Sequence, residues 1–430
     1  MCSELLRIPY VWGGVPMFGY GVLLALWAVA SAFMLAGLVR RHGWNGETWG
    51  FVPVILLVGA AIIFLPRVFP DGLPIRGYGV MLLAGGAVGV AMAALRARQV
   101  GLDPEIIFSL AFWLFIGGIL GARLFYVVEY WEQRFSHYDF RQRIFEILNF
   151  PQGGLVVYGA LFGAGIAFVM FARKHRLPIL PLADLIAPSL AFGLALGRIG
   201  CLLNGCCYGG PSDLPWAVTF PAGSPAYEDE VTHGDLYGFH LEGDEQERPL
   251  ISRVAEGATT GLTAEDRLAQ INGHEVTQLD EAKALVLESF AARQPLTLKL
   301  ATGKEIALPA ITPPARSRPV HPAQIYSAID AGLLGWLAWA FYPFRRRDGE
   351  VIALLLTIHP ITRFLLEIIR IDEPAVFGTG MSISQNISVA IFVFAMGLWW
   401  YLSRQPRGVT WGVGATGERP IGGRALATGR

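Results

Sequence analysis

Residues 381–402, MSISQNISVAIFVFAMGLWWYL, run for 22 positions without a charged side chain. A helix of about 20 apolar residues crosses the hydrocarbon core of a bilayer. Comparable uncharged runs occur elsewhere in the chain, at 19–39, 50–66, 77–95 and 153–172. Four more apolar segments contain internal charges, at about 106–129, 184–203, 323–344 and 350–370. The sequence therefore predicts an all-α polytopic membrane protein with about nine transmembrane helices.

The composition excludes several other classes of protein. Of the 430 residues, 53% are hydrophobic and only 16% are charged, whereas soluble domains carry about 25% charged residues. The formal net charge is zero, which argues against a protein that binds nucleic acid through an overall basic bias. Four cysteines in a chain of this length exclude a disulfide scaffold.

The distribution of basic residues predicts the orientation in the membrane. Cytoplasmic loops carry an excess of Lys and Arg. Here the basic residues gather in alternate loops and in the tail, at Arg40, Arg41, Arg96, Arg98, Arg173, Lys174, Arg176, Arg345, Arg346, Arg347, Arg404 and Arg407. We therefore expect the N-terminus outside and the C-terminus in the cytoplasm.

A polar segment at 210–318 interrupts the apolar ones and is expected to be an external insertion. It contains 17 acidic residues against 9 basic ones. Leu250–Val254 and Leu296–Leu300 have the apolar character of strands, and Asp280–Phe290 has that of a short amphipathic helix. The insertion is therefore predicted to be a small α+β domain.

Two stretches of this insertion resemble the PDZ family. GLTAEDRL at 261–268, followed by Ile271-Asn272-Gly273, resembles the second half of a PDZ domain, and Leu236-Tyr237-Gly238-Phe239 resembles its carboxylate-binding loop. The resemblance implies a periplasmic PDZ-like insertion that binds peptide termini or envelope proteins by strand addition. A folded spacer with no ligand is the alternative.

Charged residues inside the predicted spans are candidates for function, because each costs at least about 2.5 kcal/mol at the centre of a bilayer. Away from the ends of the spans they are Arg123, Arg198, Asp330, Arg363 and Glu367. Arg363 and Glu367 are four residues apart, so an ion pair within one helix is expected. Three arginines against two carboxylates leave a positive charge that suits a lipid phosphate. Mutual pairing with snorkelling to the interface is the alternative.

Several motifs surround these charges in a fixed order along the chain. GARLFY at 121–126 precedes a Gly-Gly pair at 153–154 that leads into Tyr158; then follow GRIGCLLNGCCYG at 197–209, HPAQIY at 321–326, RFLLE at 363–367 and Ser384-Gln385. In this order they resemble the prolipoprotein diacylglyceryl transferases of bacterial inner membranes. That family has seven spans, so the resemblance divides the chain into two extra N-terminal helices (1–72), a membrane domain in two parts (73–209 and 319–403), the insertion (210–318) and a disordered cytoplasmic tail (404–430).

The resemblance implies an enzyme that transfers a diacylglyceryl group from phosphatidylglycerol to the lipobox cysteine in the signal peptide of a prolipoprotein, with release of glycerol phosphate. Carried over by position, Arg198 and Arg363 clamp the phosphate. The catalytic candidates are Tyr158, Arg198, His321 and Arg363, and the substrate-binding candidates are Tyr78, Arg123, Asn204, Gly209, Gln324, Tyr326 and Glu367. No metal or organic cofactor is expected.

The chain departs from the family pattern at four positions. The family commonly has His at the position of Tyr158, Asn and Glu at those of Cys201 and Cys206, and Arg at that of Gly210. Tyrosine has an unperturbed pKa near 10 and is a poor base at neutral pH. Nearby arginines could lower that pKa; alternatively Tyr158 only orients the acceptor, or another residue such as His321 takes the thiol proton. A non-catalytic member that binds anionic lipid or scaffolds envelope proteins, and a transferase with another donor or acceptor, remain alternatives.

The thiol cluster of Cys201, Cys206 and Cys207 allows several interpretations. Oxidation to a disulfide would stiffen the loop, and a relay thiol could take the lipid first. The adjacent pair Cys206-Cys207 lacks the usual spacing of zinc ligands. Small packing residues are the remaining interpretation.

Overall fold

The computed structural model describes residues 4–43, 46–70, 72–148, 154, 156–244, 246, 248–255, 261–370, 375–376 and 379–412. The chain forms two compact units. The first comprises Met1–Val80, Leu203–Cys206 and Thr219–Arg318, and the second comprises Met81–Leu202, Cys207–Val218 and Pro319–Arg430. Most of the predicted disordered tail, from residue 413 onward, lies outside the described residues, as does Gly153 of the Gly-Gly pair.

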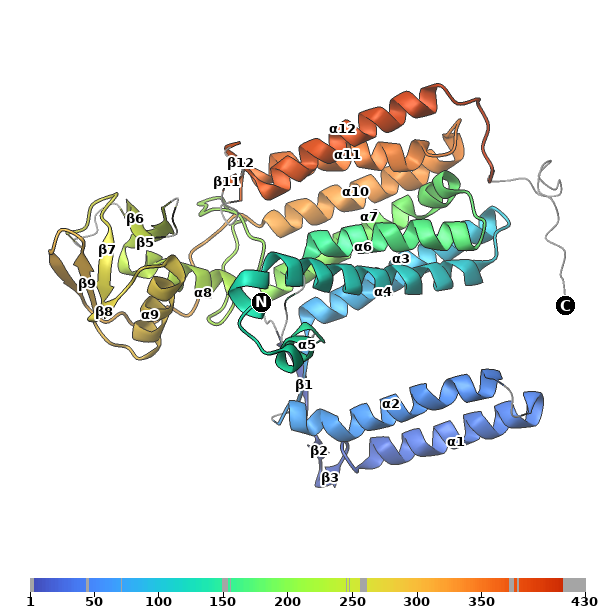
Figure 1. Ribbon diagram of the computed structural model, residues 1–430, viewed down its shortest axis with the longest axis horizontal. Coiled ribbons are helices and arrows are strands. Elements are labelled where there is room, and N and C mark those ends of the chain that lie inside the picture. Colours follow the sequence, from blue (N-terminus) through green and yellow to red (C-terminus); the bar gives the residue numbers. More distant parts are fainter. Residues whose placement is uncertain are drawn as a thin grey trace. The chain divides into compact units, whose positions relative to one another are not determined.

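The second unit is a bundle of long helices that lie side by side (Figure 1). It contains most of α3 (Gly77–Gln99), and the whole or nearly the whole of α4 (Pro104–Glu129), α6 (Val157–Lys174), α7 (Ile179–Asn204), α10 (Ala323–Phe341), α11 (Glu350–Glu367) and α12 (Ile383–Ser403). Shorter elements connect them: η1 (Trp131–Phe135), α5 (Phe140–Leu148), η4 (Tyr342–Phe344), β11 (Ala375–Val376) and β12 (Met381–Ser382).

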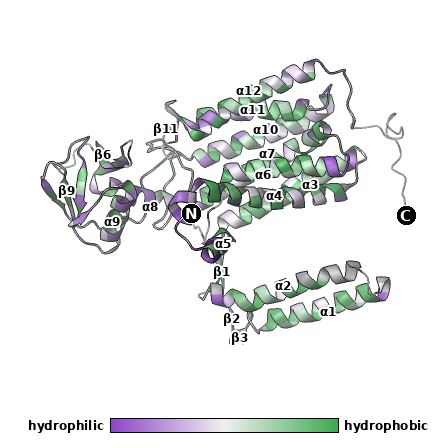
Figure 2. Ribbon diagram, in the orientation of Figure 1, coloured by the Kyte–Doolittle hydropathy of each residue, from purple (hydrophilic) through white to green (hydrophobic). Residues whose placement is uncertain are grey.

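Six described helices are long and apolar enough to cross a membrane, by length and composition: α1 (Val22–His42), α3, α4, α6, α7 and α12. Figure 2 shows apolar residues along their lengths. Helices α10 and α11 carry Asp330 and the residues Glu350, Arg363 and Glu367, respectively. A polytopic helical membrane protein is confirmed, and the count of nine spans stays a prediction.

Helices α4 and α6 approach each other through glycines at matching four-residue spacing. Gly117 and Gly121 of α4 face Gly159 and Gly163 of α6. A Cβ atom at Gly163 would lie 2.8 Å from the Cα atom of Gly121, and one at Gly121 would lie 2.7 Å from the Cα atom of Gly163. Small residues at this spacing let two membrane helices pack backbone to backbone. The contact fixes the start of α6, where Tyr158 lies.

We expect Gly163→Ala to loosen this contact, because its methyl group has no room beside Gly121. Overpacking of this kind costs about 1–3 kcal/mol, which outweighs the roughly 1 kcal/mol gain in helix propensity from Gly to Ala. Thermal unfolding in detergent should show a lower midpoint. The matched control is Gly165→Ala on the same helix, where nothing lies within 4 Å of the added Cβ. Equal midpoints for the two variants would contradict the close packing.

A buried carboxylate of α7 caps the N-terminus of α11. Asp184 is fully buried and accepts hydrogen bonds from the backbone N–H groups of Gly349 (2.7 Å), Val351 (3.0 Å) and Ile352 (2.9 Å). Its Oδ2 atom also lies 3.6 Å from Nε of the buried Arg345. The cap satisfies orphan donors of the first turn and favours the positive end of the helix dipole. It sets the position of α11, which carries Arg363.

The first unit contains an N-terminal helical hairpin. Helices α1 and α2 (Gly46–Val68) pack together, and Trp27 donates a hydrogen bond from Nε1 to the carbonyl of Ile55 (3.2 Å). Strand β1 (Glu4–Ile8) pairs antiparallel with β4 (Leu73–Arg76), which leads into α3. A short hairpin of β2 (Val11–Trp12) and β3 (Val15–Pro16) precedes α1.

The insertion is an α+β domain with a core of its own. Strand β5 (Phe239–Gly243) pairs with β6 (Pro249–Val254), and a separate sheet has the order β10-β9-β7-β8, with β7 at Leu268–Ile271, β8 at His274–Glu275, β9 at Leu296–Leu300 and β10 at Glu305–Leu308. Helices α8 (Pro225–Thr232) and α9 (Leu279–Ala291) complete it, with η3 (Asp235–Tyr237) between α8 and β5. The two predicted strands and the predicted helix are confirmed as β6, β9 and α9.

An ion pair joins the end of the insertion to its first helix. Arg318 places Nε 2.9 Å from Oε1 of Glu230, and its backbone N–H donates to Oε2 of the same carboxylate at 3.0 Å. Burial raises the pKa of Glu230, and the hydrogen bond and charge of Arg318 oppose this rise. The first and last parts of the insertion also meet, since Ala222 N–H donates to the carbonyl of Ala315 (3.3 Å). The two ends of the insertion therefore lie next to each other.

Candidate active site

Three helices of the second unit meet at the hydroxyl of Ser384, near the start of α12. Arg363 of α11 donates from Nη2 to Ser384 Oγ (3.0 Å), and the Tyr158 hydroxyl of α6 lies 3.0 Å from the same oxygen. Arg363 also donates from Nη1 to Glu367 on the next turn of α11. The predicted pair of Arg363 and Glu367 is therefore confirmed, and the structure adds Ser384 as the bridge to Tyr158.

Glu367 holds this end of α11 and the beginning of α12 together. Its side chain is buried and accepts a hydrogen bond from Ser382 Oγ (3.3 Å), while Arg370 Nη1 lies 3.7 Å from its Oε2. Ser382 and Gln385 form a reciprocal capping box at the start of α12. One carboxylate thus faces two arginines, so the cluster has a positive charge that suits an anion.

Arg198 adds a second positive charge to the same unit. It is half-buried on α7 and interacts electrostatically with His359, as do Arg363 and Asp330. Asp330 accepts a hydrogen bond from the hydroxyl of Thr362 (2.9 Å). Within the part of the chain that the structure describes, Arg198 makes no hydrogen bond or ion pair of its own. Its donors are therefore available to a ligand.

The glycine-rich signature packs on the HPAQIY motif. Gly209 N–H donates to the carbonyl of His321 (2.9 Å), and His321 N–H donates to Gly210 (3.0 Å). A Cβ atom at Gly209 would lie 2.7 Å from Cβ of His321, so the position requires glycine. Nδ1 of His321 is buried and has no hydrogen-bond partner among the described residues.

The other residues of HPAQIY lie on the first turn of α10. Gln324 is 1% exposed, and the hydroxyl of Tyr326 accepts a hydrogen bond from Trp216 Nε1 (2.7 Å). Trp216 belongs to the segment that follows the signature, and more than half of its surface is exposed. The HPAQIY motif is therefore held at two places, by Gly209 of the signature at His321 and by Trp216 of the following segment at Tyr326.

Arg123 directs its guanidinium to the main chain. Nε donates to the carbonyl of Ile147 (2.9 Å), Nη1 to that of Gly154 (3.0 Å) and Nη2 to that of Glu146. Gly154 has a φ of +76°, and a Cβ there would lie 2.6 Å from Arg123 Nη1. Arg123 thus holds the end of α5 and the approach to α6, which makes it a positioning residue for Tyr158.

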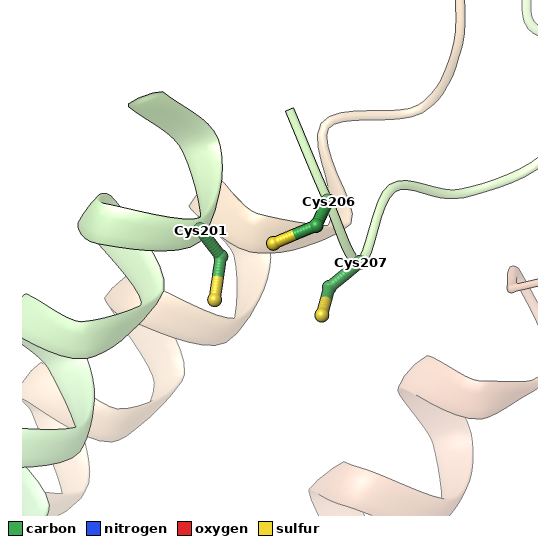
Figure 3. Close-up of side chains that lie close together, drawn as sticks. All are labelled: Cys201, Cys206 and Cys207. Atoms are coloured by element: carbon green, nitrogen blue, oxygen red, sulfur yellow. The ribbon is translucent and has the colours of Figure 1, made fainter. Parts of the chain in front are cut away.

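Two further predicted residues lie at helix ends. Tyr78 lies in the first turn of α3 and is 39% exposed, and Asn204 is the last residue of α7. The three cysteines follow one another closely in the chain at this point. The sulfur atoms of Cys201, Cys206 and Cys207 lie within 4.8 Å of one another (Figure 3).

An apolar pocket of about 210 Å³ opens between α11 and α12 beside the charged cluster. Its walls come from successive turns of the two helices: Pro360, Ile361, Phe364, Leu365, Ser388, Val389 and Phe392. Phe364 directly follows Arg363, and Ser388 lies one turn beyond Ser384. A positive cluster next to an apolar pocket suits an amphiphile with an anionic headgroup.

The sequence of residues 66–401 matches the model of the family described as prolipoprotein diacylglyceryl transferase. This chain belongs to the prolipoprotein diacylglyceryl transferase family. The match extends over every predicted site residue, from Tyr78 to Glu367. The predicted family resemblance is confirmed.

Curated relatives of this chain carry the same name. A phosphatidylglycerol–prolipoprotein diacylglyceryl transferase of Rhodopirellula baltica is 30% identical over 446 aligned residues, which cover 92% of this chain and 88% of the relative. Those of Synechococcus elongatus and Clostridium tetani are 40% and 38% identical over shorter stretches, which cover 35% of this chain and 50% and 57% of the relatives. The R. baltica protein thus resembles this transferase-family chain over most of both lengths.

The motifs of the transferase family revealed some members of the cluster and missed others. Ser382 and Arg370 were not among the candidates, and Ser384 was noted only as part of a motif. The spacing of Ser382 and Gln385 is that of a capping box, so it could have located the start of α12 and the serines beside Arg363. Arg370 lies three residues after Glu367, and that spacing could have suggested its contact with the carboxylate.

Proposed function

We propose that this chain transfers the diacylglyceryl group of phosphatidylglycerol to the lipobox cysteine of prolipoproteins in a bacterial inner membrane. The observation that supports it most strongly is the joining of Arg363, Ser384 and Tyr158 beside an apolar pocket, with Arg198 available in the same unit. The arginines would bind the phosphate and stabilise the charge that grows on the departing glycerol phosphate. The apolar pocket would take part of an acyl chain.

In this proposal the Tyr158 hydroxyl is a hydrogen-bond donor to the phosphate, held by Ser384. His321, with a buried Nδ1 atom beside the signature, is the candidate that accepts the proton of the thiol. Asn204 and Gly209 shape the donor site, and Tyr78 contacts the headgroup or the acceptor. Gln324, Tyr326 and Glu367 support the binding of substrate from α10 and α11.

Complementation of a strain depleted of its own transferase tests the proposal. The chain should restore the mass increase of one diacylglyceryl group on a reporter prolipoprotein, and the purified protein should release glycerol phosphate from phosphatidylglycerol when given a lipobox peptide. Well-folded protein that produces neither change would favour a non-catalytic lipid-binding member. Activity only with another lipid would assign a different donor.

Removal of the tyrosine hydroxyl is expected to lower turnover. Tyr158→Phe takes away one donor from the phosphate site, and loss of one such donor costs about 100-fold to 1,000-fold in rate. Single-turnover transfer to a lipobox peptide measures it. Tyr401→Phe on α12 is a control, because Tyr401 is exposed and far along the helix from Ser384. Unchanged turnover in Tyr158→Phe would reduce that residue to packing.

We infer that the insertion serves substrate or partner proteins rather than the transfer reaction. Ala222 and Ala315, near the two ends of the insertion, are joined by a backbone hydrogen bond. Deletion of 225–312 therefore removes a module whose ends are adjacent. The deleted variant is expected to lipidate a minimal lipobox peptide at the wild-type rate. A loss of this reaction would show that the insertion shapes the active site.

Binding of peptide termini or envelope proteins by the insertion is part of the same proposal. The N–H groups of Tyr237, Gly238 and Phe239 already donate to carbonyls of Gly234 and Asp235, and Leu241 N–H donates to His233. Capture of a terminal carboxylate there requires this turn to open. The N-out and C-in orientation completes the proposal, and it places the acidic insertion outside the membrane.

A further inference from the structure

The three cysteines after the signature arginine converge although they follow one another in the chain. Cys201 lies on the last turns of α7, and Cys206 and Cys207 lie on the turn after it (Figure 3). Each is half-buried, and their sulfur atoms lie within 4.8 Å of one another. A disulfide would use two of the three sulfurs, whereas a metal ion can use all three.

The backbone of this turn is strained in a way that brings the thiols together. Gly205 has a φ of +79°, which glycine adopts without cost, but Cys207 has a φ of +59°. A non-glycine residue in the left-handed region is uncommon and strained, and such residues cluster at functional sites. In this conformation Cys206 and Cys207, although consecutive, both place their sulfur atoms near that of Cys201.

The spacing of the sulfurs fits a thiophilic ion. Zinc–thiolate bonds of about 2.3 Å place neighbouring sulfurs about 3.8 Å apart in a tetrahedral site, so the sulfurs must approach by at most about 1 Å. Thiolates select Zn²⁺ and Cu⁺ among the available ions. Arg198 lies three residues before Cys201 on the same face of α7. Cys206 and Cys207 lack the usual spacing of zinc ligands along the chain, but the turn brings their sulfur atoms close to that of Cys201.

The donor set leaves one coordination position open. Among the described residues, the group consists of the three cysteine thiols, with no His, Asp or Glu side chain in it. Three protein ligands and one open position are the arrangement of catalytic rather than structural zinc sites. A thiol that enters such a position loses its proton to become a ligand. The acceptor of the proposed reaction is itself a cysteine thiol.

We propose that Cys201, Cys206 and Cys207 bind a thiophilic metal ion, Zn²⁺ or Cu⁺, whose open position takes the thiolate of the acceptor cysteine. This role rests on the proposed function, because it concerns the nucleophile of that reaction. The thiol proton leaves when the acceptor sulfur binds the ion and passes to His321 or to water. The sulfur electron pair then forms a C–S bond with the glyceryl CH₂ group, and the C–O bond to phosphate breaks. Glycerol phosphate keeps the electron pair of that bond, and the metal ion keeps its oxidation state. The product is a neutral thioether, which is a weak ligand and dissociates from the ion.

The metal content of the whole purified chain is the first test. After incubation with Zn²⁺, or with Cu⁺ without oxygen, and removal of excess ion, we expect about one ion per chain in wild type and in Cys2→Ser. We expect at least tenfold weaker binding in Cys201→Ser, Cys206→Ser and Cys207→Ser. Each ion is then challenged with a chelator of known affinity for it, and the ion that the protein retains identifies the metal. Equal binding in wild type and the triple serine variant overturns the site.

Binding of the acceptor thiol to the metal can be measured without turnover when Co²⁺ replaces the bound ion. The sulfur-to-cobalt charge-transfer absorption should rise by about one third when a lipobox peptide adds a fourth thiolate to three. A matched peptide with serine in place of the cysteine should leave it unchanged. Equal spectra with both peptides would restrict the metal to a structural role and overturn the proposed one.

Transfer assays separate failure of this inference from failure of the proposed function. The metal-free enzyme is expected to lose at least 90% of its transfer activity and to regain it with the bound ion. Full activity in metal-free enzyme would overturn the inference and leave the transferase function standing. A site that binds metal and peptide, in a chain that transfers no lipid, would overturn the proposed function instead.

Discussion

Replacement of Arg198 by alanine is expected to lower diacylglyceryl transfer at least about 100-fold with little change in thermal stability. The loss in rate follows because a positive charge directed at the developing phosphate charge is removed. The fold is retained because Arg198 makes no hydrogen bond or ion pair within the described part of the chain. Transfer to a lipobox peptide and thermal unfolding in detergent, measured on the same preparation, test both halves.

Arg363→Ala provides the contrast, because Arg363 lies in a partly buried ion pair. Its loss takes one partner from Glu367, which Arg370 and Ser382 also contact, and removes the hydrogen bond to Ser384. We expect the same loss of transfer together with a loss of stability of about 3 kcal/mol. Arg198→Lys keeps the charge but not the planar fork of donors, so it should recover only part of the rate. Wild-type activity in Arg198→Ala would contradict the phosphate clamp.

The largest loss of stability is expected from Asp184→Ala. The substitution leaves the N–H groups of Gly349, Val351 and Ile352 without their acceptor and the buried Arg345 without its carboxylate. Removal of one partner from a buried ion pair costs about 3–5 kcal/mol. Because α11 carries Arg363, transfer activity should fall with the folded fraction. Yield from the membrane and thermal unfolding in detergent measure the effect.

Asp348→Ala is the matched control for Asp184→Ala. Asp348 lies, like Arg345 and Gly349, in the loop between η4 and α11. It accepts hydrogen bonds from the N–H and hydroxyl of Thr410, at 3.0 and 2.5 Å, but in a more exposed place. Loss of an exposed contact of this kind costs about 1 kcal/mol or less. A similar loss of stability for both variants would show that negative charge near this loop, rather than the buried cap, fixes the position of α11.

The features that sequence determined are local in origin. Apolar runs predicted the helices because a membrane helix satisfies its own backbone hydrogen bonds. The pair of Arg363 and Glu367 followed from a spacing of four residues, which one turn of helix fixes. Strands β6 and β9 and helix α9 of the insertion were also foreseen, because their apolar periodicity is a property of short segments. The motifs in order identified the family without any knowledge of their contacts.

Tertiary structure decided which residues share these contacts. No local rule joins Asp184 to the N-terminus of α11, or directs the guanidinium of Arg123 to carbonyls of α5 and Gly154. Ser384 bridges Arg363 and Tyr158 only because α6, α11 and α12 meet there. The cysteines converge through a left-handed residue that spacing along the chain does not reveal. Sequence thus determined the helices, the charges and the family, whereas the active-site contacts depended on side chains from distant segments brought together by packing.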